Sequence, residues 1–191
     1  VGQFTLSTAN NSGIKVPATV KQIHGFNSAK ITVTNFVYNS STARGGLWYD
    51  TLSAMFDYSI RDLEVDCTGD SGSLSYGFLN CRNLTNCIGT GTGTGRNGYG
   101  FYGCSNLTNC KGTGTGSNGH GFRYCTNLTN CTGKGISTGA GEGYGFSNID
   151  YASNCRDGGS STDKWGGNNY NIDVETCRYS PVEADNTELN T

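Results

Sequence analysis

The stretch GFLNCRNLTNC at 77–87 decides the fold, because it returns as GFYGCSNLTNC at 100–110 and as GFRYCTNLTNC at 121–131. A tract rich in glycine follows each copy. A repeat with a short period is typical of an architecture in which each unit stacks on the next, since one unit cannot bury its apolar side alone. Each residue of the unit therefore belongs to a column that runs through the stack.

The cysteines of the repeat give its period. Members of one column are separated by 20, 23, 21, 24 and 22 residues, namely Cys67, Cys87, Cys110, Cys131, Cys155 and Cys177. A phenylalanine column keeps a similar step and consists of Phe78, Phe101, Phe122 and Phe146. Units of about 20–24 residues that must stack predict an all-β chain folded as a parallel β-helix, a β-solenoid with one coil per unit.

Within one coil the apolar residues are three apart, as in Phe78, Cys81, Leu84 and Cys87. A straight strand turns every second side chain to the same side, so a spacing of three predicts a bend between successive inward residues. Helix is disfavoured, because Asn, Thr, Gly and Cys dominate the unit. Asparagine tolerates the left-handed conformation, and we expect an asparagine ladder at one bend, formed by Asn86, Asn109, Asn130 and Asn154.

The regularity of the repeat divides the chain into three parts. Residues 1–59 are expected to form an N-terminal cap and irregular first coils, residues 60–177 the regular β-helix coils, and residues 178–191 an acidic C-terminal tail. The segments AKITVTNFV (29–37) and RDLEVDC (61–67) alternate with a period of two, so each predicts one strand.

The composition excludes several classes of protein. The 191 residues include 30 glycines without a Gly-X-Y period, so the chain is not a collagen. A formal net charge of −2 argues against a nucleic-acid partner. No apolar run is long enough for membrane insertion. The chain opens on Val1 without a signal peptide, and we expect it to be a fragment or a processed C-terminal domain.

Nine cysteines cannot all pair within one chain. Pairs such as Cys81 and Cys87 are six apart, which is not the spacing of a zinc site, and His24 and His120 are the two histidines of the chain. Buried thiols pack as small apolar groups, so we predict a ladder of reduced cysteines, with disulfides as the alternative. We expect neither a metal nor another cofactor.

The unit GF-x-x-C-x-NLTNC-x-G resembles the coils of right-handed parallel β-helix proteins and, more narrowly, those of bacteriophage tail fibres and tailspikes, over residues 60–156. FYGCSNLT (101–108) also resembles the leucine-rich repeats of bacterial surface adhesins. Those repeats continue with Ile, Leu or Val and a Pro, where this chain has GTGTGTGRNGYG (89–100), and that departure favours the β-helix.

The resemblance to tail fibres implies a function. It implies a receptor-binding protein of the virion, made in the host cytoplasm, that recognises a bacterial surface receptor, in particular a glycan. It also implies a homotrimer, in which three copies of a weak site would gain avidity. An ice-binding or purely structural solenoid is the alternative outside viruses, because Thr90 and Thr92 stand above Thr113 and Thr115 until Lys134 breaks the array.

A polysaccharide depolymerase is a further alternative, since many tailspikes of this fold cleave glycans. Such a site needs two carboxylates a definite distance apart. The dense acidic set on one outward strand face supplies weak catalytic candidates, Asp62, Glu64 and Asp66. A solvated negative face that discourages edge pairing is the favoured explanation of these acids. Two histidines in unrelated contexts give no Ser/His/Asp set, so the sequence does not support enzymatic activity.

Aromatic rings flanked by polar groups bind sugars by stacking and hydrogen bonding. Rings in insertions that escape the repeat are the first candidates, namely Trp165, followed by Trp48 and Tyr49. Three residues that follow the phenylalanines are expected to be exposed ligand-binding residues, namely Tyr102, Arg123 and Tyr124. The column two residues before each phenylalanine points either inward or to solvent, and it comprises Tyr76, Tyr99, His120 and Tyr144.

Overall fold

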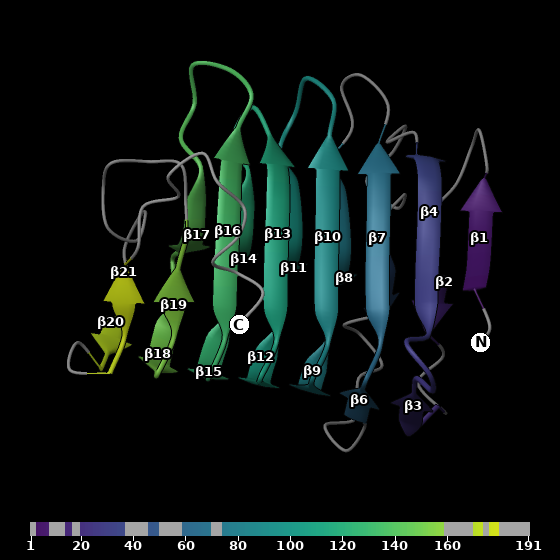
Figure 1. The fold of residues 1–191 in the computed structure, drawn as a ribbon, viewed down its shortest axis with the longest axis horizontal. Coiled ribbons are helices and arrows are strands. Elements are labelled where there is room, and N and C mark those ends of the chain that lie inside the picture. The colour runs from purple at the N-terminus through teal and green to yellow at the C-terminus, as the bar shows by residue number, and fades with distance from the viewer. Residues whose placement is uncertain are drawn as a thin grey trace.

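The structure, a computed structural model, is a parallel β-solenoid built from three sheets (Figure 1). It describes residues 3–7, 14–16, 20–36, 46–49, 59–69, 74–158, 170–173 and 176–179. All elements in these ranges are strands, and none of the described residues forms a helix long and apolar enough to cross a membrane. The predicted fold class is confirmed.

The strands fall into three sheets, and within each sheet neighbouring strands pair in the order that follows. The first sheet contains β1 (Gln3–Ser7), β4 (Lys30–Phe36), β7 (Glu64–Gly69), β10 (Ile88–Gly93), β13 (Lys111–Gly116), β16 (Thr132–Ser137), β19 (Arg156–Asp157) and β21 (Arg178–Tyr179). The second contains β17 (Tyr144–Ser147), β14 (His120–Arg123), β11 (Gly98–Tyr102), β8 (Ser75–Leu79), β5 (Leu47–Tyr49) and β2 (Ile14–Val16). The third contains β20 (Tyr170–Ile172), β18 (Asp150–Ser153), β15 (Thr126–Thr129), β12 (Ser105–Thr108), β9 (Arg82–Thr85), β6 (Ser59–Arg61) and β3 (Gln22–His24).

Each coil visits the three sheets in turn, so neighbouring strands of a sheet come from successive coils. Strands β7, β8 and β9 form one coil, and β10, β11 and β12 stack on them in register. In Figure 1 the first sheet faces the viewer, and the solenoid runs from the N-terminus at the right to β20 and β21 at the left. About four turns, from Glu64 to Ser153, are regular.

Residues in the left-handed conformation explain why inward side chains are three apart. Asn80, Asn83 and Asn86 each have φ of 53°, and each is followed directly by a buried core residue, namely Cys81, Leu84 and Cys87. A left-handed residue bends the strand, so the next inward position comes after three residues. The expected bends are therefore present, and asparagine forms most of them.

Two asparagine ladders run along the third sheet. In the predicted ladder, each side-chain amide nitrogen donates to the carbonyl oxygen of the asparagine one coil earlier, at 3.3 Å from Asn109 to Asn86 and at 3.1 Å from Asn130 to Asn109. Asn154 continues it at 2.6 Å. Sequence reasoning missed the second ladder, in which the hydrogen bonds run from Asn127 to Asn106 and from Asn106 to Asn83.

Stacked phenylalanines and cysteines fill the core. The rings of Phe78, Phe101, Phe122 and Phe146 lie 5.0, 4.8 and 5.0 Å apart and within 5° of parallel. All nine cysteines are free, and eight of them are buried, as predicted for a reduced ladder. The core thiols donate to carbonyl oxygens, as Cys110 does to Thr108 at 3.4 Å. A thiol buried in this way is a small apolar group with a satisfied hydrogen.

Buried glycines bring the first and second sheets into backbone contact. A Cβ placed on Gly91 of β10 would lie 2.2 Å from the carbonyl oxygen of Tyr99. A Cβ on Gly98 of β11 would meet the carbonyl oxygen of Gly91 at the same distance. Side chains would force the sheets apart, so the glycine-rich tract is required by packing. This tract is thus one wall of the solenoid.

The predicted strand at 61–67 is wrong in its boundaries. Arg61 ends β6, Asp62 lies at a corner with φ of 55°, and β7 begins at Glu64. The alternating pattern spans this corner, because a left-handed residue shifts the register without interrupting the succession of polar and apolar residues. Within the predicted strand at 29–37, residues Lys30–Phe36 form one strand, β4, and residue 37 lies outside the described residues.

Candidate functional site

The tyrosine column, defined as Tyr76, Tyr99, His120 and Tyr144, lies on the second sheet. Glycines on either side of Tyr99 face the first sheet, so the tyrosine points to the opposite, outer face of the second sheet. The four rings stack at 5.4, 5.7 and 5.7 Å, and all four side chains are buried. The column therefore does not share the phenylalanine core, although it is not exposed either.

A second row on the same face places one cation among aromatic rings. Tyr102 of β11 packs edge-on against Tyr99 at 5.1 Å and against Tyr124 at 5.4 Å. The guanidinium carbon of Arg123 lies 5.6 Å from the ring centre of Tyr99 and 5.1 Å from that of Tyr124. We call these residues together with His120 the Arg123 cluster. Three predicted ligand-binding residues, Tyr102, Arg123 and Tyr124, are thus brought together.

Hydrogen bonds orient the guanidinium. Arg123 Nη1 donates to the Tyr99 hydroxyl at 3.3 Å, and Nη2 donates to the Tyr124 hydroxyl at 3.4 Å. Nη1 also lies 3.0 Å from Nε2 of His120. Because arginine is only a donor, this histidine nitrogen accepts and the proton of the neutral ring lies on Nδ1. That Nδ1 is buried without a hydrogen-bond partner.

Burial keeps His120 uncharged. Desolvation, followed by repulsion from the Arg123 guanidinium, lowers the pKa of His120 to about 4. At neutral pH the imidazole is therefore a neutral acceptor for the guanidinium. The one net charge of the Arg123 cluster at neutral pH is that of Arg123.

Tyr124 occupies a strained backbone position at the surface. It lies at the corner between the second and third sheets with φ of 53°, where successive coils have Asn80, Gly103, Tyr124 and Asn148. Asparagine and glycine adopt this conformation readily, whereas a bulky residue there costs on the order of 1–3 kcal/mol. Its side chain is 47% exposed. A strained, exposed aromatic in a column of asparagine and glycine is an indication of function rather than of folding.

Sequence reasoning also missed a tyrosine with positive φ that is not part of the Arg123 cluster. Tyr151 of β18 has φ of 61° and is 53% exposed, in the column of Asn83, Asn106 and Asn127. The signal was present in the sequence as a departure from the asparagine column. Tyr99 and His120 were also missed as neighbours of Arg123, because the sequence left the direction of their column open.

The other predicted aromatic residues cannot be placed in this site. Trp48 and Tyr49 belong to β5, whose backbone pairs with β2 and β8, but their side chains are not among those described. Trp165, the first choice from the sequence, lies outside the described residues.

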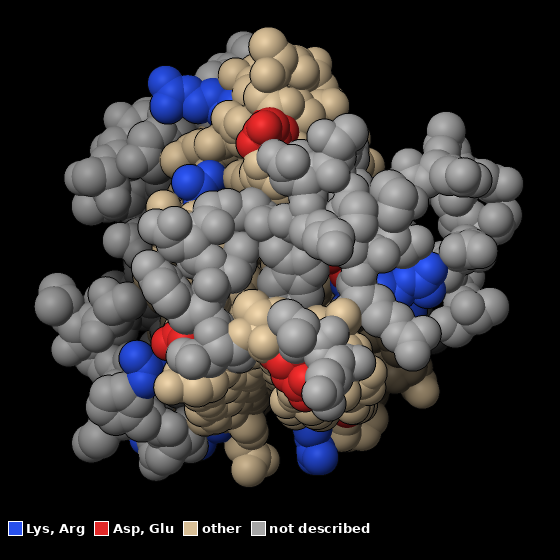
Figure 2. Space-filling model, turned by 90° about the vertical axis from the view of Figure 1, so that its left-hand side faces the viewer, with Lys and Arg blue, Asp and Glu red and all other residues tan. Residues whose placement is uncertain are grey.

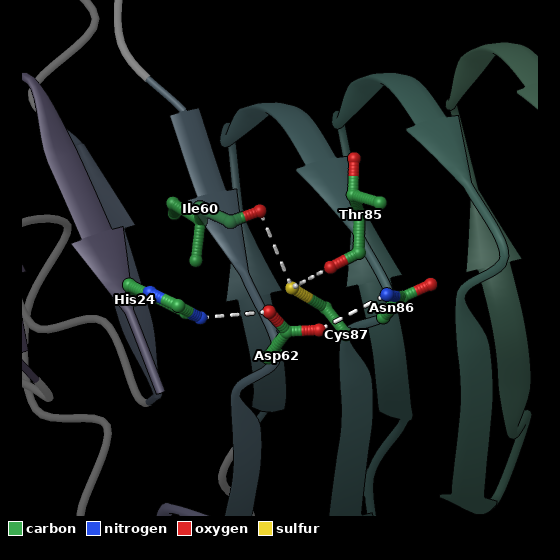
Figure 3. Close-up of polar contacts among 6 residues, drawn as sticks. All are labelled: His24, Ile60, Asp62, Thr85, Asn86 and Cys87. Atoms are coloured by element: carbon green, nitrogen blue, oxygen red, sulfur yellow. Dashed lines mark hydrogen bonds and ion pairs between the residues drawn. The ribbon is translucent and has the colours of Figure 1, made fainter. Parts of the chain in front are cut away.

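The weak catalytic candidates contact basic side chains of the preceding coil, and Figure 3 shows the contact between Asp62 and His24. His24 Nε2 lies 2.9 Å from Asp62, and Asn86 donates to the same carboxylate at 3.0 Å, so Asp62 starts the predicted asparagine ladder. The Asn86 hydrogen bond, with smaller help from His24, lowers the pKa of Asp62. Lys30 Nζ lies 2.7 Å from Glu64 and 3.4 Å from Asp66. These contacts explain the acids as polar links between coils.

The threonine array is short. Thr90 pairs with Thr113 and Thr92 with Thr115, but the next strand, β16, has Lys134 and Ile136 in these two rows. The preceding strand, β7, has Asp66 and Thr68 there.

Outside the Arg123 cluster, the described charged side chains and potential metal ligands are dispersed. At the C-terminal end of the solenoid, the described basic and acidic side chains lie interspersed with other residues (Figure 2). Within the described ranges, no group of three or more His, Cys, Asp or Glu side chains could hold a metal ion.

The fold and the Arg123 cluster together define a β-solenoid with an aromatic, cationic surface site. Comparison of the chain with models of known protein families, with curated proteins and with solved structures finds no match.

Proposed function

We propose that this β-solenoid recognises a glycan at the Arg123 cluster, as the receptor-binding part of a phage tail fibre or tailspike. The observation that carries the proposal is the exposed ring of Tyr124, held at φ of 53° beside the guanidinium of Arg123. The tail-fibre assignment rests on the resemblance of the repeat alone.

The chemistry of the cluster suits a sugar. A tyrosine ring offers a flat apolar face on which the C–H groups of a sugar ring can stack, and its hydroxyl offers a polar edge. Arg123 supplies directional donors within reach of the same ligand. Arg123 ends β14 and Tyr124 lies at the corner that follows it, and contacts between the two orient both side chains, so little side-chain freedom is lost on binding. In a homotrimer three such sites would act together, and avidity would compensate for weak single-site affinity.

Because Tyr124 has a strained backbone conformation, a substitution can remove its ring without destabilising the fold. The substitution Tyr124→Asn restores the residue type of the same column in other coils, Asn80 and Asn148. It should therefore preserve or raise the stability of the fold while it removes the stacking ring. Tyr151→Asn is the matched control, because it makes the same change at another left-handed position of the next coil.

A glycan array probed with the purified chain tests the proposal. We expect binding by the parent chain and by Tyr151→Asn, and at least a tenfold loss of affinity in Tyr124→Asn. Undiminished binding by Tyr124→Asn would show that the glycan binds at a site other than the Arg123 cluster. Release of shortened glycan would support a depolymerase instead. Silence on every glycan, together with shaping of ice crystals, would support the ice-binding alternative.

A further inference from the structure

The surroundings of Arg123 differ from those of Lys30 and His24. Lys30 and His24 both contact carboxylates of the next coil. The contacts of Arg123, by contrast, are with Tyr99, His120 and Tyr124, none of which has a carboxylate. Among the described residues, no acidic side chain lies within ion-pair distance of its guanidinium.

The hydrogen bonds of Arg123 are also weak and incomplete. Its bonds to the two tyrosine hydroxyls, at 3.3 and 3.4 Å, are longer than the usual 2.7–3.2 Å range. Its Nε is buried and has no hydrogen-bond partner. A guanidinium has five N–H donors. The two on Nη1 and one on Nη2 have partners in Tyr99, His120 and Tyr124, and the Nε hydrogen is buried, so the second Nη2 hydrogen remains for a ligand.

The aromatic rings around Arg123 should strengthen the binding of an anion to its guanidinium. The rings of Tyr99 and Tyr124 cover parts of the guanidinium and exclude water there, which makes an ionic interaction stronger than it would be in water. The neutral His120 fixes one Nη1 hydrogen and contributes no competing charge. Tyr124, which is exposed, would stack on the sugar ring next to the bound acid group.

We propose that the ligand of the Arg123 cluster is an acidic glycan, whose carboxylate binds the Arg123 guanidinium while its sugar ring stacks on Tyr124. This inference rests on the proposed function, since it names the chemical class of glycan that the same site binds. The carboxylate is the feature that matters, whether a uronic acid or another carboxyl-bearing sugar supplies it.

Matched ligands test the inference without any change to the protein. Each of several oligosaccharides that contain uronic acid is compared with its carboxyl-reduced counterpart, which has the same linkages but a neutral hydroxymethyl group. We expect the parent chain to bind the acidic form about tenfold to a hundredfold more tightly, the factor that a charge-assisted hydrogen bond provides. Sodium chloride at about 0.5 M should reduce this preference.

The variants Arg123→Gln and Arg123→Lys test whether Arg123 causes the preference for the acidic form of the glycan. Arg123→Gln should bind both forms with the weaker affinity, and Arg123→Lys should keep part of the preference, because lysine retains the charge and loses the planar guanidinium that the neighbouring side chains orient. Circular dichroism and the denaturation midpoint check that each variant is folded.

The outcomes separate the two proposals. Equal binding of acidic and neutral forms by the parent chain overturns this inference and leaves the proposed function standing. Preference for the acidic form that persists in Arg123→Gln overturns the assignment to Arg123. Binding of neither form, nor of any glycan on the array, overturns the proposed function as well.

Discussion

The side-chain amide of Asn130 donates to the carbonyl oxygen of Asn109 at 3.1 Å, and the two residues are 21 positions apart in the sequence. Each also has a positive φ, of 54°, so each turns the chain from the third sheet to the first. One residue type thus makes the corner and links it to the next coil. The same relationship repeats along the third sheet, and it holds the columns in register.

The asparagine ladder can be tested at Asn109. Replacement by alanine removes two ladder hydrogen bonds and puts a side chain with no local hydrogen bond at φ of 54°. We expect a loss of about 2 kcal/mol in the free energy of unfolding, measured by chemical denaturation. Asn109→Gly is the control, because glycine loses the bonds but accepts the conformation, and it should cost about 1 kcal/mol less than alanine. Equal losses would show that the backbone conformation contributes little.

The backbone contact between the first and second sheets predicts that a side chain at Gly91 would severely destabilise the fold. In Gly91→Ala the new Cβ would lie 2.2 Å from the Tyr99 carbonyl oxygen and 2.6 Å from that of Ser75, and backbone atoms cannot move away cheaply. We expect a loss of about 3 kcal/mol or more, or failure to fold. Gly139→Ala is the control, since its Cβ would meet nothing within 4 Å. A stable Gly91→Ala protein with unchanged spectra would contradict the close packing.

The lowered pKa of His120 in the folded state predicts that the free energy of unfolding depends on pH. Its folded pKa is lowered to about 4, whereas in the unfolded chain it has the ordinary value of 6.5. The unfolded state therefore binds the proton first as pH falls, so stability is complete above about pH 6.5 and decreases down to about pH 4. The loss amounts to about 3 kcal/mol for this group.

The variant His120→Tyr isolates this contribution. Tyrosine fits the column, as Tyr99 and Tyr144 show at the neighbouring positions, and it does not titrate between about pH 4 and 7. Denaturation at a series of pH values should show that the parent chain loses more stability than the variant over this interval. Parallel curves for the two proteins would mean that His120 is already exposed or charged in the folded state.

The cysteine columns predict slow and selective alkylation. Burial raises the pKa of Cys67 to about 12, so its reactive thiolate is scarce at about pH 8. Cys177 is the one cysteine that is only partly buried. In the folded protein, iodoacetamide should therefore label Cys177 first, as peptide mass spectrometry would show, and all nine cysteines should react in guanidinium chloride. A native mass two daltons low would instead reveal a disulfide.

The period, the columns and the existence of bends could be predicted from the sequence. Phe78 and its equivalents, the cysteine column and the ladder through Asn86 and Asn109 all follow from counting, because stacking forces equivalent residues into contact. The local pattern of polar and apolar residues did not predict the corner at Asp62. Polar and apolar residues continue to alternate there, although the strand ends, because one left-handed residue changes the direction of the chain.

The candidate site depended on the tertiary structure. The sequence selected Tyr102, Arg123 and Tyr124 as a group, but it could not show that Tyr99 and His120 turn to the outer face of the same sheet. That direction is decided by the glycines, which pack backbone against backbone on the inner face and leave the large rings only the outer one. The sequence by itself determined what repeats and what stacks. Only the packing of the two sheets decided which face carries Arg123 and its aromatic neighbours.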